Sequence, residues 1–206
     1  VVTGICCQIR GEVTIKGTAS HAGTTPMDLR KDALAAAAEC MLEIEDEAKK
    51  YPQAVATVGK ITAFPGGVNV VPGEVKFSID MRNQKAALRD AMFDKCVERM
   101  KAVCEKRGVS LDVNVLMKDD EGKPCADHIQ DIVAESCEKA GLPVFRMPSG
   151  AGHDSSTFAD FCPMGMIFIR SKDGLSHNKD EYSSPEDCAA GAEVLYHTLL
   201  KLASED

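Results

Sequence analysis

The chain has 206 residues, of which 44% are hydrophobic and 27% charged, so it is long enough for one good core or two small globular domains. Its formal net charge of −8, without a stripe dense in lysine and arginine, argues against a nucleic-acid or anionic-membrane partner. No apolar run is long enough to span a bilayer, and no signal-peptide pattern stands at the start.

The nine cysteines are scattered singly, except for the adjacent Cys6 and Cys7. An odd number without a C-x-x-C pair argues against both a disulfide framework and a structural zinc ribbon. A reducing, cytoplasmic compartment is therefore expected. Four cysteines fall in helical patterns and are predicted to be small buried side chains: Cys40, Cys96, Cys104 and Cys137.

The first half of the chain alternates between strand and helix patterns. Residues 9–17 alternate apolar and polar side chains, as in a half-buried strand. Apolar side chains then recur at helical spacing over 34–48, with Asp28 as the expected N-terminal cap and Pro52 as the end of that helix. Four further elements follow: a strand at 54–63, a strand at 75–82, a helix through 88–103 and a strand at 110–117.

The order strand–helix–strand–strand–helix–strand predicts an α+β fold, namely a ferredoxin-like, four-stranded antiparallel sheet with both helices on one face. The polar stretch 118–123 predicts a domain boundary. The chain starts at Val1 rather than at a methionine, so we expect a fragment or a processed piece of a longer protein.

Beyond residue 123 the pattern changes to alternating helices and strands. The apolar run 164–169 is hydrophobic on both faces, as a buried parallel strand would be. A parallel sheet needs more strands than this part of the chain supplies, so we predict an α/β segment of an incomplete domain. The other elements expected here are a helix near 126–140, an extended stretch at 143–147, a helix after His153 and a helix from Pro185.

His21 lies in the small, turn-prone run 17–27, between the first strand and the first helix. The glycines, alanines and serine around it remove bulk, as the close approach of a ligand requires. An exposed imidazole there is available for hydrogen bonding or proton transfer. The alternative is an ordinary surface histidine.

Asn69 and Arg82 stand on either side of one turn in the sequence and are expected to converge in space. A forked guanidinium and an amide donor together can hold a carboxylate. The alternative is that Arg82 pairs with Asp80 on the solvated face of its strand, and both interpretations stay open at this point.

A third loop contains Gly150, Gly152 and His153, before a predicted helix. Successive backbone N–H groups at a helix start suit an anion or an oxyanion. The alternative is an ordinary helix cap, formed by Asp154 or Ser155.

His177 follows Gly174 and Ser176 in a loop that is expected to leave the carboxyl edge of a parallel sheet, the usual site location in open α/β folds. Its imidazole is a candidate metal ligand, which Asp180 or Glu181 could orient; the alternative is a capping or surface residue. A hydrolytic zinc centre needs about three protein ligands. Because only His177 is a persuasive ligand, we expect no complete metal site within this chain.

Five motifs occur in one order along almost the whole chain, and together they resemble the M20-type metal-dependent amidohydrolases of the L-carbamoylase, allantoate amidohydrolase and ureidoglycolate amidohydrolase group. The motifs are Gly17-Thr18-Ala19-Ser20-His21-Ala22-Gly23-Thr24-Thr25-Pro26-Met27 with Arg30, Asp32 and Ala33, then Val68-Asn69-Val70-Val71-Pro72-Gly73, Asp80-Met81-Arg82, Ser149-Gly150-Ala151-Gly152-His153-Asp154, and Ser176-His177-Asn178 with Asp180-Glu181-Tyr182-Ser183.

The resemblance implies a lid or dimerisation domain at 9–118, set within a catalytic domain whose returning end is 119–206, with 1–8 as a connecting segment. It also implies two divalent metal ions, Zn²⁺ or Mn²⁺, most of whose ligands lie in a preceding half that is absent here. His177 would be the last metal ligand.

The same resemblance implies roles for the other loop residues. His21 would stabilise a developing oxyanion, and Asn69 and Arg82 would hold the substrate carboxylate, with all three reaching across a homodimer formed through the lid. The residues expected to bind substrate in addition are Gly150, Gly152, His153, Gly174 and Ser176.

The function implied is hydrolysis of a C–N bond in a small ureido or carbamoyl compound by a metal-activated water. N-carbamoyl-L-amino acids, allantoate and ureidoglycolate are the candidate substrates, and the fragment alone is expected to be inactive. The alternatives are a fragment of an M20 metallopeptidase or aminoacylase, and a non-catalytic dimerisation module.

Overall fold

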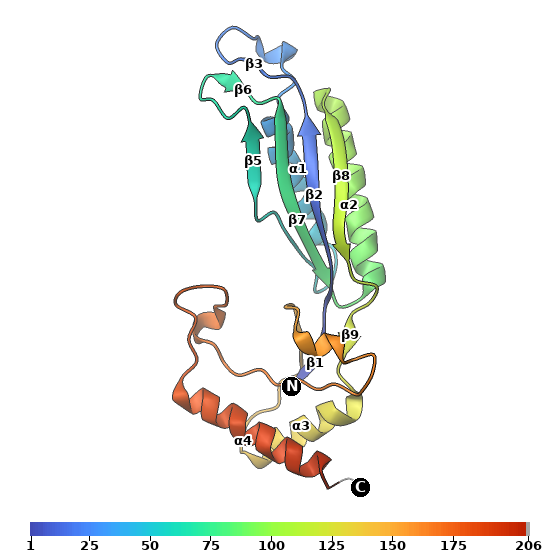
Figure 1. The fold of residues 1–206 in the computed structure, drawn as a ribbon, viewed down its shortest axis with the longest axis vertical. Coiled ribbons are helices and arrows are strands. Elements are labelled where there is room, and N and C mark those ends of the chain that lie inside the picture. Colours follow the sequence, from blue (N-terminus) through green and yellow to red (C-terminus); the bar gives the residue numbers. More distant parts are fainter. Residues whose placement is uncertain (205–206) are drawn as a thin grey trace. The chain divides into compact units, whose positions relative to one another are not determined.

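Figure 1 shows the computed structural model of the chain, which describes residues 1–204. It is a mixed α/β structure with four α-helices and several sheets among these residues. Contacts within the chain divide it into two compact units. The central unit is Cys7–Gly122, and the flanking unit consists of Val1–Cys6 together with the residues from Lys123 onward.

The central unit contains an antiparallel sheet with the strand order β4-β7-β2-β8. β2 (Cys7–Lys16) pairs along its length with β7 (Glu74–Asn83) on one side and with β8 (Ser110–Lys118) on the other. β4 (Val55–Thr57) and β5 (Ile61–Phe64) pair with opposite ends of β7.

The single strand expected at 54–63 is therefore wrong, because the structure has two short strands there. The break is the three residues Val58, Gly59 and Lys60. The N–H of Lys60 donates to Oγ of Ser78 at 3.1 Å, and the carbonyl of Lys60 accepts the N–H of Ser78 at 2.9 Å. A side-chain hydroxyl thus replaces a backbone acceptor at this point and interrupts the regular ladder.

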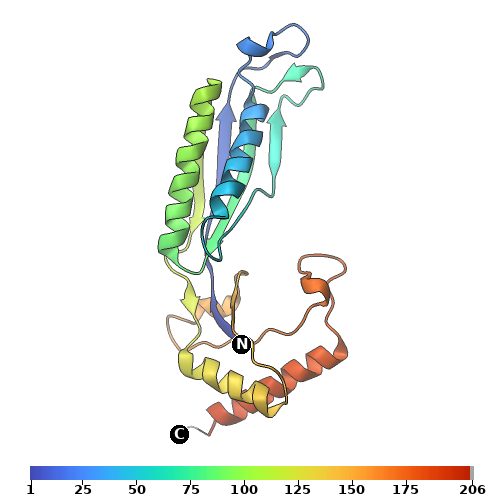
Figure 2. The ribbon, with the colours of Figure 1, turned by 180° about the vertical axis from the view of Figure 1, so that it is seen from behind.

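One face of this sheet forms the core of the central unit. Every second side chain of β7, from Val75 to Met81, is at most 2% exposed, as the alternating pattern predicts. The helices α1 (Ala33–Ala48) and α2 (Ala86–Arg107) supply the other side of this core. Figures 1 and 2 show both helices on the same face of the sheet.

The cysteines predicted to be buried in helices follow this packing. Cys40, Cys96 and Cys104 are at most 2% exposed, so they are confirmed as core residues, whereas Cys137 is only half-buried. Burial raises the pKa of the Cys96 thiol to about 11. All nine cysteines are free thiols.

The start of α1 differs from the sequence prediction. Asp32, not Asp28, is the N-terminal cap, and its Oδ1 accepts the N–H groups of Leu34 and Ala35 at 2.9 and 3.0 Å. Asp28 lies in a short 3₁₀ turn, Met27–Leu29, which an extended Arg30 separates from α1.

The flanking unit has a three-stranded sheet and two helices. β1 (Val2–Ile5) lies between β10 (Met147–Ser149), to which it is parallel, and β9 (Lys123–Pro124), to which it is antiparallel. α3 (Asp127–Lys139) and α4 (Pro185–Leu202) pack against each other.

Two expected elements of the flanking unit are absent from the described residues. The helix after His153 is only a four-residue 3₁₀ turn, Asp154–Thr157. The run 164–169 is not a strand, because the N–H of Val2 in β1 donates to the carbonyl of Met166 at 3.1 Å but no ladder with a strand forms along this run among residues 1–204. Among the described residues, every helix is too short or too polar to cross a bilayer.

Candidate functional site

His21 and Asn69 are brought side by side by a two-stranded ribbon at one end of the central unit. β3 (Ser20–His21) pairs with β6 (Val70–Val71), with His21 opposite Val70. The N–H of Ala22 extends this pairing by donating to the carbonyl of Asn69 at 2.9 Å. The side chains of His21 and Asn69 are both exposed, so a ligand can reach them.

The His21 ring is held by its own turn. The N–H of Gly23 donates to Nδ1 of His21 at 3.0 Å. Because Nδ1 acts as an acceptor, the neutral imidazole carries its proton on Nε2. A Cβ at Gly23 would lie 3.3 Å from Cε1 of His21, so a glycine suits this close turn.

Arg30 fastens the loop that carries His21. Its Nη2 donates to the carbonyl of Ala22 at 2.6 Å, and its Nε donates to the carbonyl of Thr25 at 3.1 Å. Hydrogen bonds from a charged guanidinium are stronger than neutral ones. The sequence prediction included Arg30 in a motif but gave it no role, because its partners are backbone carbonyls, which the sequence does not mark.

Asn69 and Arg82 do not converge within one chain, so that expectation is wrong. Glu74, at the start of β7, pairs with Phe64, and the loop carrying Asn69 connects these two residues. Arg82 lies near the other end of the same strand, eight residues after Glu74. At about 3.4 Å per residue, this places Arg82 about 27 Å from Glu74 along the strand. Two side chains cannot bridge that length of strand.

Arg82 instead pairs with Asp80, as the alternative interpretation predicted. Its Nε and Nη2 donate to the two carboxylate oxygens of Asp80 at 2.7 and 2.8 Å. Nε of Arg10 donates to the same carboxylate at 3.0 Å. The hydrogen bonds from Arg82, more than those from Arg10, lower the pKa of Asp80 below its ordinary value.

The loop with Gly150, Gly152 and His153 follows β10 and lies in the flanking unit. His153 itself is the cap, and its Nδ1 accepts the N–H of Ser155 at 3.1 Å. The expected caps Asp154 and Ser155 are therefore wrong. The four-residue 3₁₀ turn does not provide the helix start on which the anion site depended.

The loop with Gly174, Ser176 and His177 also belongs to the flanking unit. Gly174 and His177 have φ angles of 66° and 56°, and Oε2 of Glu181 accepts the N–H of His177 at 2.8 Å. Glu181 thus binds the main chain of His177. The sequence analysis had expected Asp180 or Glu181 to orient the imidazole ring instead. The His177 ring is exposed.

A complete metal centre is not formed by residues 1–204, in which no group of three or more His, Cys, Asp or Glu side chains is arranged to hold an ion. His177 alone offers one exposed imidazole, which is fewer than the about three protein ligands that a catalytic zinc requires. These residues by themselves therefore do not fit a metal site.

Comparison with known sequences finds a family model and several relatives that are similar to almost the whole chain. A model described as peptidase family M20/M25/M40 matches residues 12–201. N-carbamoyl-L-amino acid amidohydrolase from Geobacillus stearothermophilus is 44% identical over 98% of this chain and 49% of the relative. Allantoate amidohydrolase from Escherichia coli is 37% identical over 98% of this chain and 49% of the relative. Ureidoglycolate hydrolase from Arabidopsis thaliana is 36% identical over 98% of this chain and 43% of the relative.

Solved structures show the same relationship. The crystal structure of a putative amidohydrolase/peptidase from Burkholderia cenocepacia superposes with a TM-score of 0.90 at 37% identity, covering 100% of this chain and 50% of that one. The chain thus spans about half the length of the curated relatives and of the solved structure that it matches.

Proposed function

Because the chain belongs to peptidase family M20/M25/M40, we propose that it is part of a ureido amidohydrolase, which hydrolyses a C–N bond of an N-carbamoyl-L-amino acid, allantoate or ureidoglycolate. The observation that carries this proposal is the 36 to 44% identity to relatives named for these three activities. The chain spans about half of each relative, so the activity is proposed for a longer protein, and this chain alone is expected to be inactive.

His21 is proposed to stabilise the charge that develops during the reaction. When water adds to the carbamoyl carbon, the carbonyl oxygen gains negative charge, and a positioned N–H donor lowers the energy of that state. The turn at Gly23 supports this role, since it occupies Nδ1 and leaves Nε2–H as the donor. Collapse of the tetrahedral adduct then breaks the C–N bond and releases the nitrogen as ammonia or an amine.

Metal dependence is general in this family, and we propose that His177 supplies one imidazole ligand to a pair of divalent ions, Zn²⁺ or Mn²⁺. Such ions lower the pKa of a bound water and polarise a carbonyl. The other ligands would have to come from outside the described residues. Gly150, Gly152, His153, Gly174 and Ser176 are proposed to line the substrate side of the same region.

Arg82 and Asn69 are proposed to bind the substrate carboxylate, but they must come from different chains. The length of β7 separates Arg82 from the His21–Asn69 end of the central unit. We therefore propose that each site combines His21 and Asn69 of one chain with Arg82 of its homodimeric partner. This changes the arrangement implied by the resemblance, in which all three residues came from one lid.

The central unit is proposed to be a ferredoxin-like lid through which the homodimer forms, with the flanking unit as the returning end of the catalytic domain. The open edge at β4 and β5 supports this, because β7 is the one strand with which either of them pairs among residues 1–204. Exposed apolar side chains gather there and on α1, including Val55 (52%), Ile61 (46%) and Leu42 (67%). A cytoplasmic location is proposed from the nine free cysteines.

The test is a chimera in which this chain replaces the matching half of the Geobacillus stearothermophilus relative. Release of ammonia from N-carbamoyl-L-amino acids, allantoate and ureidoglycolate is measured beside hydrolysis of dipeptides and N-acetyl amino acids. Turnover confined to ureido substrates supports the proposal. Turnover confined to dipeptides or N-acetyl amino acids would instead favour the peptidase or aminoacylase alternative.

A further inference from the structure

The face of the central sheet that is turned away from α1 and α2 (Figure 1) carries a group of three charged side chains, Arg10, Asp80 and Arg82. Asp80 and Arg82 are two residues apart on β7 and lie on this face, whereas Ile79 and Met81 lie in the core on the other face. Arg10 of β2 is directly opposite Asp80 in the register of the two strands. The pairing of the sheet thus brings two guanidinium groups to one carboxylate.

The carboxylate of Asp80 holds Arg82 along one edge of its guanidinium. Nε and Nη2 of Arg82 donate to Oδ1 and Oδ2 of Asp80 at 2.7 and 2.8 Å, and Nε of Arg10 donates to the same Oδ2 at 3.0 Å. Two parallel hydrogen bonds to one carboxylate fix the plane of a guanidinium, which otherwise moves on a long, flexible side chain. The side chains of Arg82 and Asp80 are only 23% and 27% exposed, so salt and solvent screen this pair less than a fully exposed one.

A guanidinium fixed in this way can hold a second carboxylate. Asp80 takes the edge formed by Nε and Nη2, and a planar guanidinium has another edge, formed by Nη1 and Nη2, with the same forked geometry. Two arginines and one aspartate leave one positive charge on the group, which favours an anion. The residues opposite Arg82 in the neighbouring strands, Gln8 of β2 and Val55 of β4, are uncharged. They therefore do not compete with an anion for the arginine.

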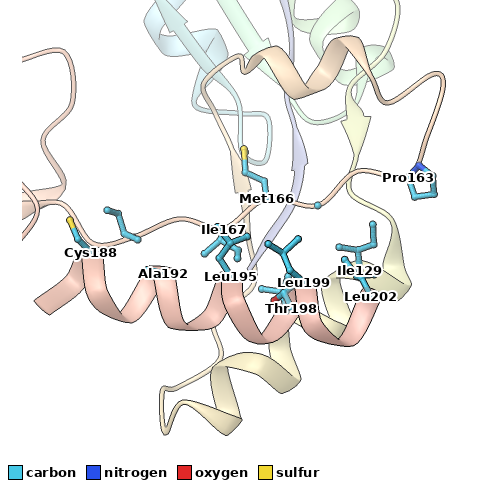
Figure 3. A pocket seen from close by; sticks show the side chains of 14 residues that line it. Ile129, Pro163, Met166, Ile167, Cys188, Ala192, Leu195, Thr198, Leu199 and Leu202 are labelled. Atoms are coloured by element: carbon cyan, nitrogen blue, oxygen red, sulfur yellow. The ribbon is translucent and has the colours of Figure 1, made fainter. Parts of the chain in front are cut away.

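The apolar groove of the flanking unit is unsuited to bind a carboxylate. Figure 3 shows this groove, which has a volume of about 590 Å³ and lies between α3, α4 and the segment that follows Pro163. Among residues 1–204, the side chains that line it are uncharged, and those of Leu195 and Leu199 reach into it from α4. A carboxylate in such a groove would lose its hydration without gaining a cation. The charged face of the central sheet is the better place for a substrate carboxylate.

We propose that Asp80 is a positioning residue for Arg82, which it holds so that the Nη1–Nη2 edge receives the substrate carboxylate, and that Arg10 holds Asp80 in turn. The proposal rests on the proposed function, in which Arg82 binds that carboxylate. A guanidinium that is ordered before the substrate arrives loses less conformational entropy when it binds. The ion pair between Asp80 and Arg82 thus contributes to substrate binding, although Asp80 does not contact the reacting atoms.

Nitrogen-15 NMR of the arginine side chains in this chain tests, independently of activity, whether Asp80 orders Arg82. The variant is Asp80→Asn, and the matched control is Glu12→Gln, which removes a carboxylate from the same face of the sheet, where Glu12 lies 3.8 Å from Nζ of Lys76. The Arg82 signals are identified by their loss in Arg82→Lys. Because two parallel bonds hinder rotation of the guanidinium, we expect separate Nη1 and Nη2 signals for Arg82 in the wild type and in the control, and one averaged signal in Asp80→Asn.

Steady-state kinetics of the chimera with an N-carbamoyl-L-amino acid then tests whether this ordering serves substrate binding. We expect Asp80→Asn to raise KM about tenfold, as for a weakened hydrogen bond to a charged group. The value of kcat should change little, because the carboxylate is held equally in the ground state and the transition state. Glu12→Gln should leave both values unchanged, and circular dichroism checks that each variant is folded.

The proposal is overturned if Arg82 gives the same signals in Asp80→Asn as in the wild type. It is also overturned if KM stays unchanged, if Glu12→Gln raises KM equally, or if KM falls, which would show that Asp80 competes with the substrate for Arg82. A wild-type chimera that does not hydrolyse ureido substrates would contradict the proposed function, while the NMR spectra would still decide whether Asp80 orders Arg82.

Discussion

The backbone N–H of Gly23 donates to Nδ1 of His21 at 3.0 Å, so the residue two places along the chain determines which nitrogen of the imidazole can donate. The prediction is that neutral His21 is the Nε2–H tautomer. Nitrogen-15 NMR of the imidazole rings in this chain checks it, since protonated and unprotonated nitrogens have well-separated shifts. A mixture of tautomers, or the Nδ1–H form, would contradict the proposed donor role.

Arg30 is expected to act as a positioning residue for His21 through its two bonds to the loop carbonyls of Ala22 and Thr25. Arg30→Lys retains the charge but a single ammonium cannot reproduce the fork. In the chimera we expect about a tenfold to hundredfold loss of kcat, as for a small displacement of a catalytic group.

The same Arg30→Lys change should broaden or mix the His21 tautomer signal in this chain. Arg107→Lys is the matched control, because Arg107 pairs with Glu39 on the helices and not with the loop. An unchanged His21 signal in Arg30→Lys, or an equal effect of the control, would show that Arg30 does not position the ring.

Asp80 should stabilise the central unit in a pH-dependent way. Its pKa is lowered in the folded chain, chiefly by hydrogen bonds from Arg82, so its contribution is present above the ordinary carboxyl pKa of about 4 and is lost as the pH falls through the lower folded value. We expect Asp80→Asn to lower the free energy of unfolding by about 1 kcal/mol at pH 7.

The difference in the free energy of unfolding between the wild type and Asp80→Asn should decrease as the pH falls below about 4. Urea denaturation at a series of pH values measures it, with Asp94→Asn as the control, since Asp94 is exposed and has no ion pair among the described residues. A difference that is constant with pH would contradict the account of this cluster.

The separation of His21 from Arg82 predicts subunit complementation. In the chimera, His21→Ala and Arg82→Ala should each be nearly inactive alone. A heterodimer of the two variants has one site in which both side chains are intact. Random pairing should therefore restore about a quarter of the wild-type activity. If His21 and Arg82 instead came from one chain, mixing would restore nothing, and the two-chain site would be wrong.

Much of the central unit could be predicted from the sequence, because local periodicity determines it. The alternation in 75–82 identified β7 and its buried face, and the buried cysteines followed from helical spacing. The distances between loops in the folded chain could not be predicted in the same way. Asn69 and Arg82 are close in sequence, but they lie at opposite ends of the long strand β7. The periodic pattern of a strand does not show which loop lies at which of its ends.

The flanking unit shows a different limit of sequence prediction. The run 164–169 has the composition of a buried strand, yet a strand exists only where a neighbour completes its ladder of hydrogen bonds. Among residues 1–204, β1 gives this run one bond, from the N–H of Val2 to the carbonyl of Met166, and no ladder. Arg30 was missed as a functional contact for a related reason, since its partners are backbone carbonyls, which carry no sequence signal.

The measurement that tests the central claim most directly is ammonia release from an N-carbamoyl-L-amino acid by the chimera, compared between the wild-type chain and His21→Ala. The account predicts turnover by the wild-type chimera and a loss of kcat of about 10² to 10³ for His21→Ala, as for removal of one oxyanion donor, with KM little changed. Equal kcat values for the two proteins would contradict it.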